Sequence, residues 1–154
     1  MHEIGIVVIG RNEGDRLRAS LDSALAANFP LIYVDSGSSD LSCQIAKAKN
    51  IPTVELENVE PFTAARARNA GFKQIIDLYP ELKYIQFLDG DCQLIEGWIP
   101  QGVDYLKNHS QVAIVTGDLH EMEAKESIYN NLCELEWRKE PGELKACGGN
   151  FLIK

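Results

Sequence analysis

The segment Tyr84-Ile85-Gln86-Phe87-Leu88 runs directly into Asp89-Gly90-Asp91, and this junction is the most informative stretch of the sequence. The mostly apolar run predicts a buried strand. Glycine lets the backbone turn and lets a ligand come close, so both carboxylates can face outward at the strand end. Mg²⁺ and Mn²⁺ prefer oxygen ligands and are commonly held by one or two carboxylates and substrate phosphates. We therefore predict a divalent cation site at Asp89 and Asp91; a plain strand-to-loop turn is the alternative.

Further strands lie on both sides of this junction in the chain. Apolar runs predict them at residues 4–9, 31–34, 53–56 and 112–116, with the first and the last of these strands buried. Between successive strands, apolar residues recur at helical spacing. This alternation predicts an α/β fold with a mostly parallel sheet and helices on both faces. Such sheets bind ligands at the carboxyl ends of their strands, where the sequence places Asn12, Asp35 and the Asp89-Gly90-Asp91 turn.

The last part of the chain has a different pattern. A helix is predicted at residues 127–138, with an apolar stripe formed by Ile128, Leu132 and Leu135. Glu134 on that helix is expected at the surface. Short strands are predicted at 144–147 and 151–153, around the glycines of Gly148-Gly149-Asn150.

Length and composition limit the class of protein. The chain has 154 residues, 45% of them hydrophobic, which suits one folded domain with its own core. It carries 15 basic and 23 acidic residues, a net charge of −8, which disfavours nucleic acids and anionic membranes as partners. No apolar run reaches membrane-spanning length, and no Cys-x-x-Cys pair indicates a zinc or redox site. We expect a cytoplasmic protein with free cysteines and without a membrane span.

The end of the second predicted strand also carries polar groups. Asp35, followed by Gly37 in a serine-rich turn, offers an exposed carboxylate and backbone amides that suit a nucleoside, such as the imide N–H of uracil. A turn with a helix cap at Asp40 is the alternative. Arg66 and Arg68 lie on the helix predicted after Thr63 and can balance a diphosphate, unless they belong to a solvated helix face.

Several other sites are disfavoured. Residues 10–14 do not form a Walker loop or a Gly-x-Gly-x-x-Gly fingerprint, so P-loop hydrolysis and nicotinamide dinucleotide binding are unexpected. A nucleotidyltransferase and a haloacid-dehalogenase-type phosphatase are poor matches to the loop after the first strand and to the mid-chain position of Asp89-Gly90-Asp91. His120-Glu121 is expected to be an ordinary polar loop and, less readily, a metal or acceptor contact.

Together these motifs resemble family 2 glycosyltransferases with the GT-A fold. The resemblance rests on Val8-Ile9-Gly10-Arg11-Asn12-Glu13, Val34-Asp35-Ser36-Gly37-Ser38-Ser39-Asp40, Ala67-Arg68-Asn69-Ala70-Gly71 and Phe87-Leu88-Asp89-Gly90-Asp91. Each segment is loose alone, but the four in this order are specific. The chain resembles the N-terminal, nucleotide-sugar-binding portion of such an enzyme.

The resemblance implies a role for each matched residue. Those implied for nucleotide-sugar binding are Asn12, Glu13, Asp35, Gly37, Arg66, Arg68 and Asp89. Asp35 would contact the base of a uridine or guanosine diphosphate sugar. Asp89 would approach the ribose or the metal, Mn²⁺ or Mg²⁺, that Asp91 binds directly. Ser36 stands where many members carry a second aspartate, which leaves the nucleotide preference open.

The resemblance also implies the reaction, a metal-dependent, inverting transfer of a sugar to a hydroxyl of a saccharide or lipid-linked acceptor. The catalytic base of the family is a carboxylate that follows the Gly148-Gly149-Asn150 segment, and it is expected beyond Lys154. We therefore expect one GT-A-like domain over 1–154 that is truncated at its C-terminus. Within it, 1–117 would form the nucleotide-binding core and 118–154 the start of the acceptor side. A non-catalytic nucleotide-sugar-binding module is the alternative.

Overall fold

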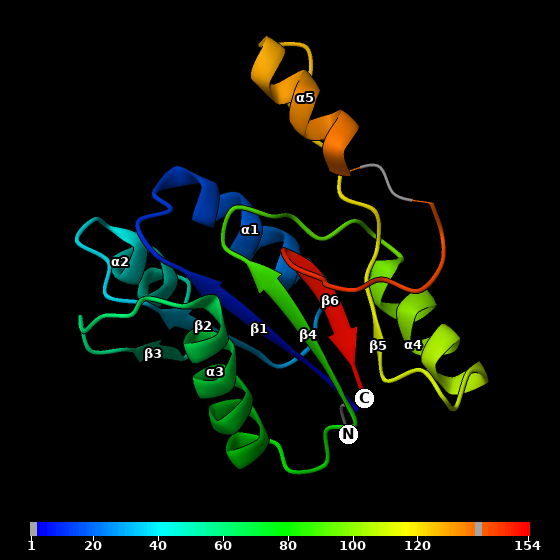
Figure 1. The fold of residues 1–154 in the computed structure, drawn as a ribbon. Coiled ribbons are helices and arrows are strands. Elements are labelled where there is room, and N and C mark those ends of the chain that lie inside the picture. Colours follow the sequence, from blue (N-terminus) through cyan, green and yellow to red (C-terminus); the bar gives the residue numbers. More distant parts are fainter. Residues whose placement is uncertain (1–2, 138–139) are drawn as a thin grey trace.

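The computed structural model describes residues 3–137 and 140–154 and contains one six-stranded sheet in the order β3-β2-β1-β4-β6-β5 (Figure 1). The strands are β1 (Ile4–Gly10), β2 (Leu31–Asp35), β3 (Thr53–Glu55), β4 (Tyr84–Asp89), β5 (Ile114–Val115) and β6 (Asn150–Ile153). The helices are α1 (Asp15–Ala26), α2 (Ser42–Ala48), α3 (Ala64–Leu78), α4 (Trp98–Asn108) and α5 (Ile128–Trp137).

The predicted α/β fold is confirmed. Strands β1 to β4 pair in parallel, and β6 pairs antiparallel with both β4 and β5. The chain moves from β1 outward to β2 and β3, then returns to place β4 on the other side of β1. The carboxyl ends of β1 and β4 therefore lie side by side, although 79 residues of sequence numbering separate Gly10 from Asp89.

Helices cover both faces of the sheet, as the alternating pattern predicts. On one face, α1, α2 and α4 bury apolar side chains such as Leu21, Ile45 and Leu106. On the other face, α3 buries Ala67 and Ile75 against β1, β2 and β4. Gly71 lets α3 approach closely, because a Cβ there would lie 2.4 Å from Cγ1 of Val7. The apolar clusters on the two faces of the sheet hold the strands, and therefore the strand ends, in place.

The outer edge of the sheet differs from the prediction. The strand at 112–116 is only Ile114–Val115, and Ile114 is 49% exposed rather than buried, because β5 is the last strand of the sheet. The short strand predicted at 144–147 is wrong, since those exposed residues have no neighbouring strand to pair with; only β6 forms.

Helix α5 forms at the predicted place, with Ser127 Oγ accepting a hydrogen bond from the amide of Asn130 at 3.0 Å. Its predicted last residue, Arg138, lies outside the described residues. The helix stands apart from the sheet (Figure 1) and buries none of its described residues. Its apolar stripe is exposed, and Ile128 reaches 80%. Within 3–137 and 140–154, no helix is long and apolar enough to cross a bilayer.

Candidate functional site

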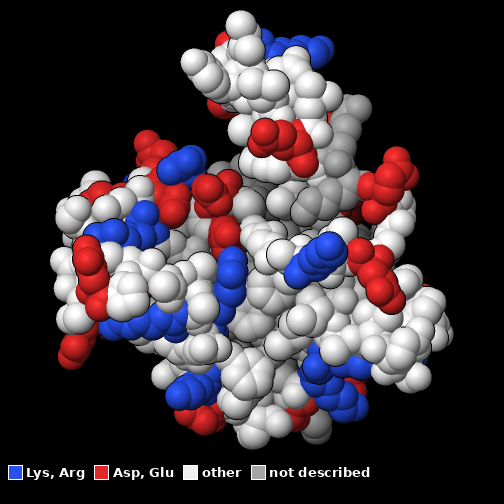
Figure 2. Space-filling view, in the orientation of Figure 1, with Lys and Arg blue, Asp and Glu red and all other residues white. Residues whose placement is uncertain are grey.

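The candidate site lies between the carboxyl ends of β1 and β4. The connections from these two neighbouring strands lead in opposite directions, to β2 on one side and toward β6 on the other. Such a reversal leaves a crevice outside the strand ends, which is where open α/β sheets bind ligands. The loop after β1 holds Asn12 and Glu13, and the turn after β4 holds Asp91. Figure 2 shows acidic and basic side chains side by side around these strand ends.

The loops after β1 and β2 are bonded to each other on the β2 side of the crevice. The amide of Asn12 donates to Ser38 Oγ at 2.9 Å, and Asn12 Oδ1 accepts from the amide of Ser39 at 2.8 Å. Asn12 has a φ of 57°, a conformation that asparagine tolerates better than most residues. The predicted cap, Asp40, accepts from the amides of Gly14 at 3.0 Å and Ser42 at 2.9 Å, although Leu41 is the N-cap position of α2. The two loops thus form one unit.

Asp35 lies at the base of this unit. The prediction that its carboxylate is exposed is wrong, since the residue is only 1% exposed. Its carboxylate accepts from the hydroxyl of Tyr33 at 2.9 Å, and from the amide and hydroxyl of Ser38 at 2.7 and 2.6 Å. Tyr33 and Asp35 are two apart on β2 and therefore share a face of the sheet. Burial, reinforced by the Asp35 charge, raises the pKa of Tyr33, so its hydroxyl stays a donor.

Glu13 connects the two strand ends. A Cβ on Gly10 or Gly90 would lie 3.0 or 3.1 Å from Glu13 Cγ, so glycine at both positions leaves room for this side chain. Burial, together with the charges of Asp91 and then Asp89, raises the pKa of Glu13. Arg16 offsets part of this charge through an ion pair of 3.2 Å with Glu13. Carboxylates from both loops therefore converge where a cation would be stabilised.

The two predicted arginines have different surroundings. Arg68 Nη2 lies 2.7 Å from Asp89 Oδ1, and the Arg68 guanidinium carbon lies 5.2 Å from the Phe151 ring centroid. Arg68 Nε is buried and has no hydrogen-bond partner among the described residues. Arg66 instead donates from Nη1 to the carbonyls of Glu57 and Val59 at 3.2 and 3.0 Å. The structure thus brings Arg68 to the Asp89 carboxylate and ties Arg66 to the loop before α3.

The donor set at the crevice fits a hard divalent cation. Asp89 and Asp91 offer carboxylate oxygens, which Mg²⁺ and Mn²⁺ prefer. Among residues 3–137 and 140–154, no group of three or more His, Cys, Asp or Glu side chains is placed to hold a metal ion. Two carboxylates leave ligand positions open, and Mg²⁺ commonly fills such positions with water and with oxygen atoms of a substrate. Next to Asp91, burial and the neighbouring carboxylates raise the pKa of Cys92 to about 12, so this thiol stays protonated.

Several contacts at the site were not predicted from the sequence. The Arg11 guanidinium lies 3.6 Å from the centroid of the Phe62 ring, which joins the β1 loop to the segment before α3. The amide of Asp89 donates to the carbonyl of Gly149 at 2.7 Å. Beneath this bond, Gln86 is fully buried. A glutamine within the otherwise apolar run 84–88 was the available signal for this last feature.

Glu134 on α5 is not the surface residue that the sequence predicts. Its side chain is 15% exposed; Oε1 lies 3.3 Å from His120 Nδ1, and Oε2 accepts from the amide of Glu121 at 2.8 Å. This pairing holds α5 to the 120–121 loop. The prediction of a polar loop at His120-Glu121 agrees with these contacts.

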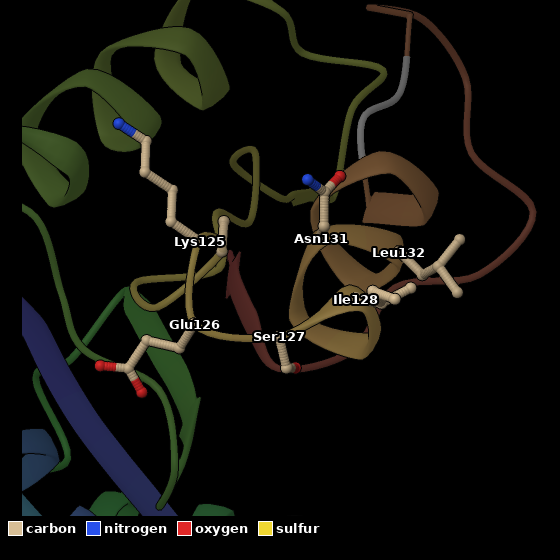
Figure 3. A pocket seen from close by; sticks show the side chains of 7 residues that line it. Lys125, Glu126, Ser127, Ile128, Asn131 and Leu132 are labelled. Atoms are coloured by element: carbon tan, nitrogen blue, oxygen red, sulfur yellow. The ribbon is translucent and has the colours of Figure 1, made fainter.

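A separate hollow of about 550 Å³ lies at the start of α5. Figure 3 shows its lining residues, Ala124, Lys125, Glu126, Ser127, Ile128, Asn131 and Leu132. The Lys125 and Glu126 side chains extend away from each other in this view. None of the predicted site residues lines this hollow, and ligand sites usually bring a few polar groups together. The strand-end crevice is therefore the stronger candidate.

Comparison with known proteins gives a consistent picture. The sequence profile of Glycosyl transferase family 2 matches residues 5–151. No curated protein matches the sequence significantly. A mannosyltransferase from Pyrobaculum calidifontis, solved with GDP-Man and Mn²⁺, is 17% identical with a TM-score of 0.62, over 79% of this chain and 36% of that one.

Glucosyl-3-phosphoglycerate synthase from Mycobacterium tuberculosis is similar in the same way. Its complex with UDP is 20% identical with a TM-score of 0.60, over 97% of this chain and 56% of that one. Its complex with Mn²⁺ and UDP-glucose is 19% identical with a TM-score of 0.61, over 97% and 55% of the two chains. At this level of identity the likeness shows a shared fold. The chain spans between 36% and 56% of the length of these solved proteins.

Proposed function

Because the chain belongs to Glycosyl transferase family 2, whose profile covers residues 5–151, we propose that its strand-end crevice binds a nucleoside diphosphate sugar together with a divalent cation. The bound sugar would be transferred to an acceptor hydroxyl. The observation that carries this proposal is the convergence of the Asp89-Gly90-Asp91 turn, Glu13 and Arg68 at the reversal point of the sheet. Open α/β sheets bind their ligands at this point.

Each group has a proposed task that suits its surroundings. The loops after β1 and β2, with Asn12, Asp35 and Gly37, would receive the nucleoside. Asp35 is internally bonded, so its task includes holding Ser38 and the shape of the loop. Residues 1–117 would thus form the nucleotide-binding part.

The diphosphate would lie near Arg68, whose buried Nε has no hydrogen-bond partner in the described part of the chain and can donate to a phosphate oxygen. Asp91 and Asp89 would hold the cation, which stabilises the negative charge that develops on the departing nucleoside diphosphate. Arg66, bonded to the loop before α3, would shape the pocket wall rather than contact phosphate.

The proposed transfer inverts the anomeric centre. The acceptor hydroxyl would attack the sugar from the face opposite the diphosphate, and a general base would take its proton. For that base we propose a carboxylate outside the residues assigned above. What this chain's own residues would contribute is orientation of the donor and electrostatic stabilisation of the leaving group.

Thermal unfolding with a panel of uridine, guanosine, cytidine and thymidine diphosphates, each with and without Mn²⁺, tests the binding proposal. A ligand at about 100 times its dissociation constant adds about 2.7 kcal/mol of stability. For a chain of this size, that raises the melting temperature by roughly 5–11 °C. Asp91→Asn should lose the Mn²⁺-dependent part of the shift. Glu136→Gln, an exposed carboxylate on α5, is the matched control.

An absence of any shift across the panel would sink the proposal. A separate assay for release of nucleoside diphosphate from UDP-glucose and GDP-mannose addresses turnover. Release of nucleoside diphosphate would exclude the non-catalytic module of the same fold.

A further inference from the structure

A buried polar network lies beneath the Asp89-Gly90-Asp91 turn. Gln86 on β4 is 0% exposed and makes three hydrogen bonds. Its Nε2 donates to Asn150 Oδ1 and to the Phe87 carbonyl, both at 2.6 Å. Its Oε1 accepts from Trp98 Nε1 on α4 at 2.7 Å. The same face of β4 otherwise carries the core residues Tyr84 and Leu88. An amide in this place is costly unless all its bonds are made.

The network continues into the segment that contacts the turn. Thr116 Oγ1 donates to the carbonyl of Asn150 at 2.6 Å. Gly149, the residue before Asn150, has a φ of 74° and presents its carbonyl to the amide of Asp89 at 2.7 Å. A chain of direct contacts therefore runs from Gln86 through Asn150 and Gly149 to Asp89.

The same contacts fix how β6 aligns with β4. Leu88 stands opposite Asn150 in the antiparallel register, and Gln86 stands opposite Leu152. The Gln86–Asn150 bond is thus a diagonal cross-strand contact. A slip of one residue would turn the Asn150 side chain to the other face of the sheet and break the bond. It would also move the Gly149 carbonyl away from Asp89.

We propose that Gln86 is a positioning residue for the Asp89-Gly90-Asp91 turn. By bonding Asn150 it fixes the Gly149 carbonyl, and that carbonyl holds the Asp89 amide and so sets where the two carboxylates point. Its consequence for cation and diphosphate binding rests on the proposed function. Groups that orient metal ligands from behind typically change metal affinity by about 10–100-fold when removed. The three hydrogen bonds of the Gln86 side chain go to Phe87, Asn150 and Trp98, so it acts on the two carboxylates through these neighbours.

Two variants and one control test this role. Gln86→Leu replaces the amide with an apolar side chain of similar size and removes all three hydrogen bonds, whereas Trp98→Phe removes only one. Ile75→Val, in the core on the opposite face of the sheet, lowers stability without touching the network. Circular dichroism establishes that each variant is folded at the temperature of the assay.

The first readout is hydrogen exchange in the peptide spanning residues 87–92, measured by mass spectrometry without ligand. Exchange there should be at least about tenfold faster in Gln86→Leu, less accelerated in Trp98→Phe, and unchanged in Ile75→Val. The second readout is the dissociation constant for UDP and for GDP, each with Mn²⁺, by calorimetry. It should rise about 10–100-fold in Gln86→Leu and stay at the wild-type value in Ile75→Val.

The outcomes separate the two proposals. If the wild-type chain binds none of the four nucleoside diphosphates of the thermal panel, the proposed function fails while the exchange measurement still decides the positioning role. Unchanged exchange in residues 87–92 of Gln86→Leu would overturn that role. Faster exchange with wild-type affinity would overturn its consequence for binding. If Gln86→Leu does not fold, Trp98→Phe decides by the same two readouts, because it keeps a large aromatic ring at position 98.

Discussion

Helices α1 and α5 have the same kind of apolar spacing in the sequence and very different surroundings in the structure. In α1, Leu17, Leu21 and Ala24 are fully buried against the sheet. In α5, Ile128, Leu132 and Leu135 form an equally regular stripe, yet the helix buries none of its described residues. Apolar periodicity therefore indicates an amphipathic helix but not what covers its apolar face.

Polar contacts differ between the two regions as well. The loops around the strand ends are bonded to one another, as in the contacts of Asn12 with Ser38 and Ser39. Helix α5 is joined to the rest through Glu134 and the 120–121 loop. We therefore expect the strand-end loops to unfold with the core, and α5 to be energetically separate from it.

The largest expected difference is in core packing. Leu21→Ala removes a fully buried side chain and should lower the free energy of unfolding by about 2–5 kcal/mol. Leu132→Ala, the same change on the exposed stripe of α5, should lower it by less than about 0.5 kcal/mol. Urea unfolding followed by circular dichroism measures both. Equal losses in the two variants would show that α5 packs as tightly as α1.

A smaller difference in the loss of unfolding free energy is expected between two serines whose hydroxyls each accept a hydrogen bond from a backbone amide. Ser38 Oγ donates to the Asp35 carboxylate and accepts from the Asn12 amide, so Ser38→Ala should cost about 1–3 kcal/mol of global stability. Ser127→Ala removes the contact at the start of α5 and should reduce helicity locally. The urea midpoint of Ser127→Ala should stay at the wild-type value; a shift as large as that of Ser38→Ala would contradict the separation.

The smallest expected effect is a pH dependence of the folded chain's stability that comes from Glu13. Its pKa in the folded chain is raised above 4.5 by burial and by Asp91 and Asp89, so the folded state holds this proton after the unfolded chain has lost it. Stability is then lost as pH rises from about 4.5 through the folded-state pKa. Glu13→Gln cannot ionise. Its melting temperature relative to wild type should rise across that interval and then level off.

Melting curves of wild type and Glu13→Gln, recorded without ligand at several pH values, measure this difference. Glu136→Gln on α5 is the matched control, because it removes an exposed carboxylate far from the crevice loops in sequence. A difference for Glu13→Gln that falls as pH rises would show that its carboxylate is stabilised in the folded state.

Much of the fold followed from local pattern. The alternation of apolar runs and helical spacing predicted β1 to β4 and their helices, because β1, β2 and β4 are buried between helices on the two faces of the sheet. The same pattern wrongly predicted a strand at 144–147, and it predicted more burial at 112–116 than the structure shows. An apolar run becomes a buried strand only if other strands and helices pair with it and cover it. These two segments lie at or beyond the last strand of the sheet.

The candidate site was predicted in part for the same reason. The strand-end positions of Asn12, Asp35 and Asp89 follow from sequence alternation alone. Side-chain partners do not, because they come from segments distant in sequence: Asp35 bonds Tyr33 and Ser38 and is buried. The Gln86 network likewise joins β4, α4 and β6, and only the three-dimensional register brings those residues together.

The most direct test of the central claim is hydrogen exchange across the whole chain, with and without Mn²⁺ and the nucleoside diphosphate that gives the largest thermal shift. Binding at the crevice predicts slower exchange in residues 10–14, 35–40, 66–71 and 87–92. Residues 128–137 of α5 should exchange at the same rate in both samples. Protection confined to α5 and the hollow at 124–132, with none at the strand ends, would contradict the account.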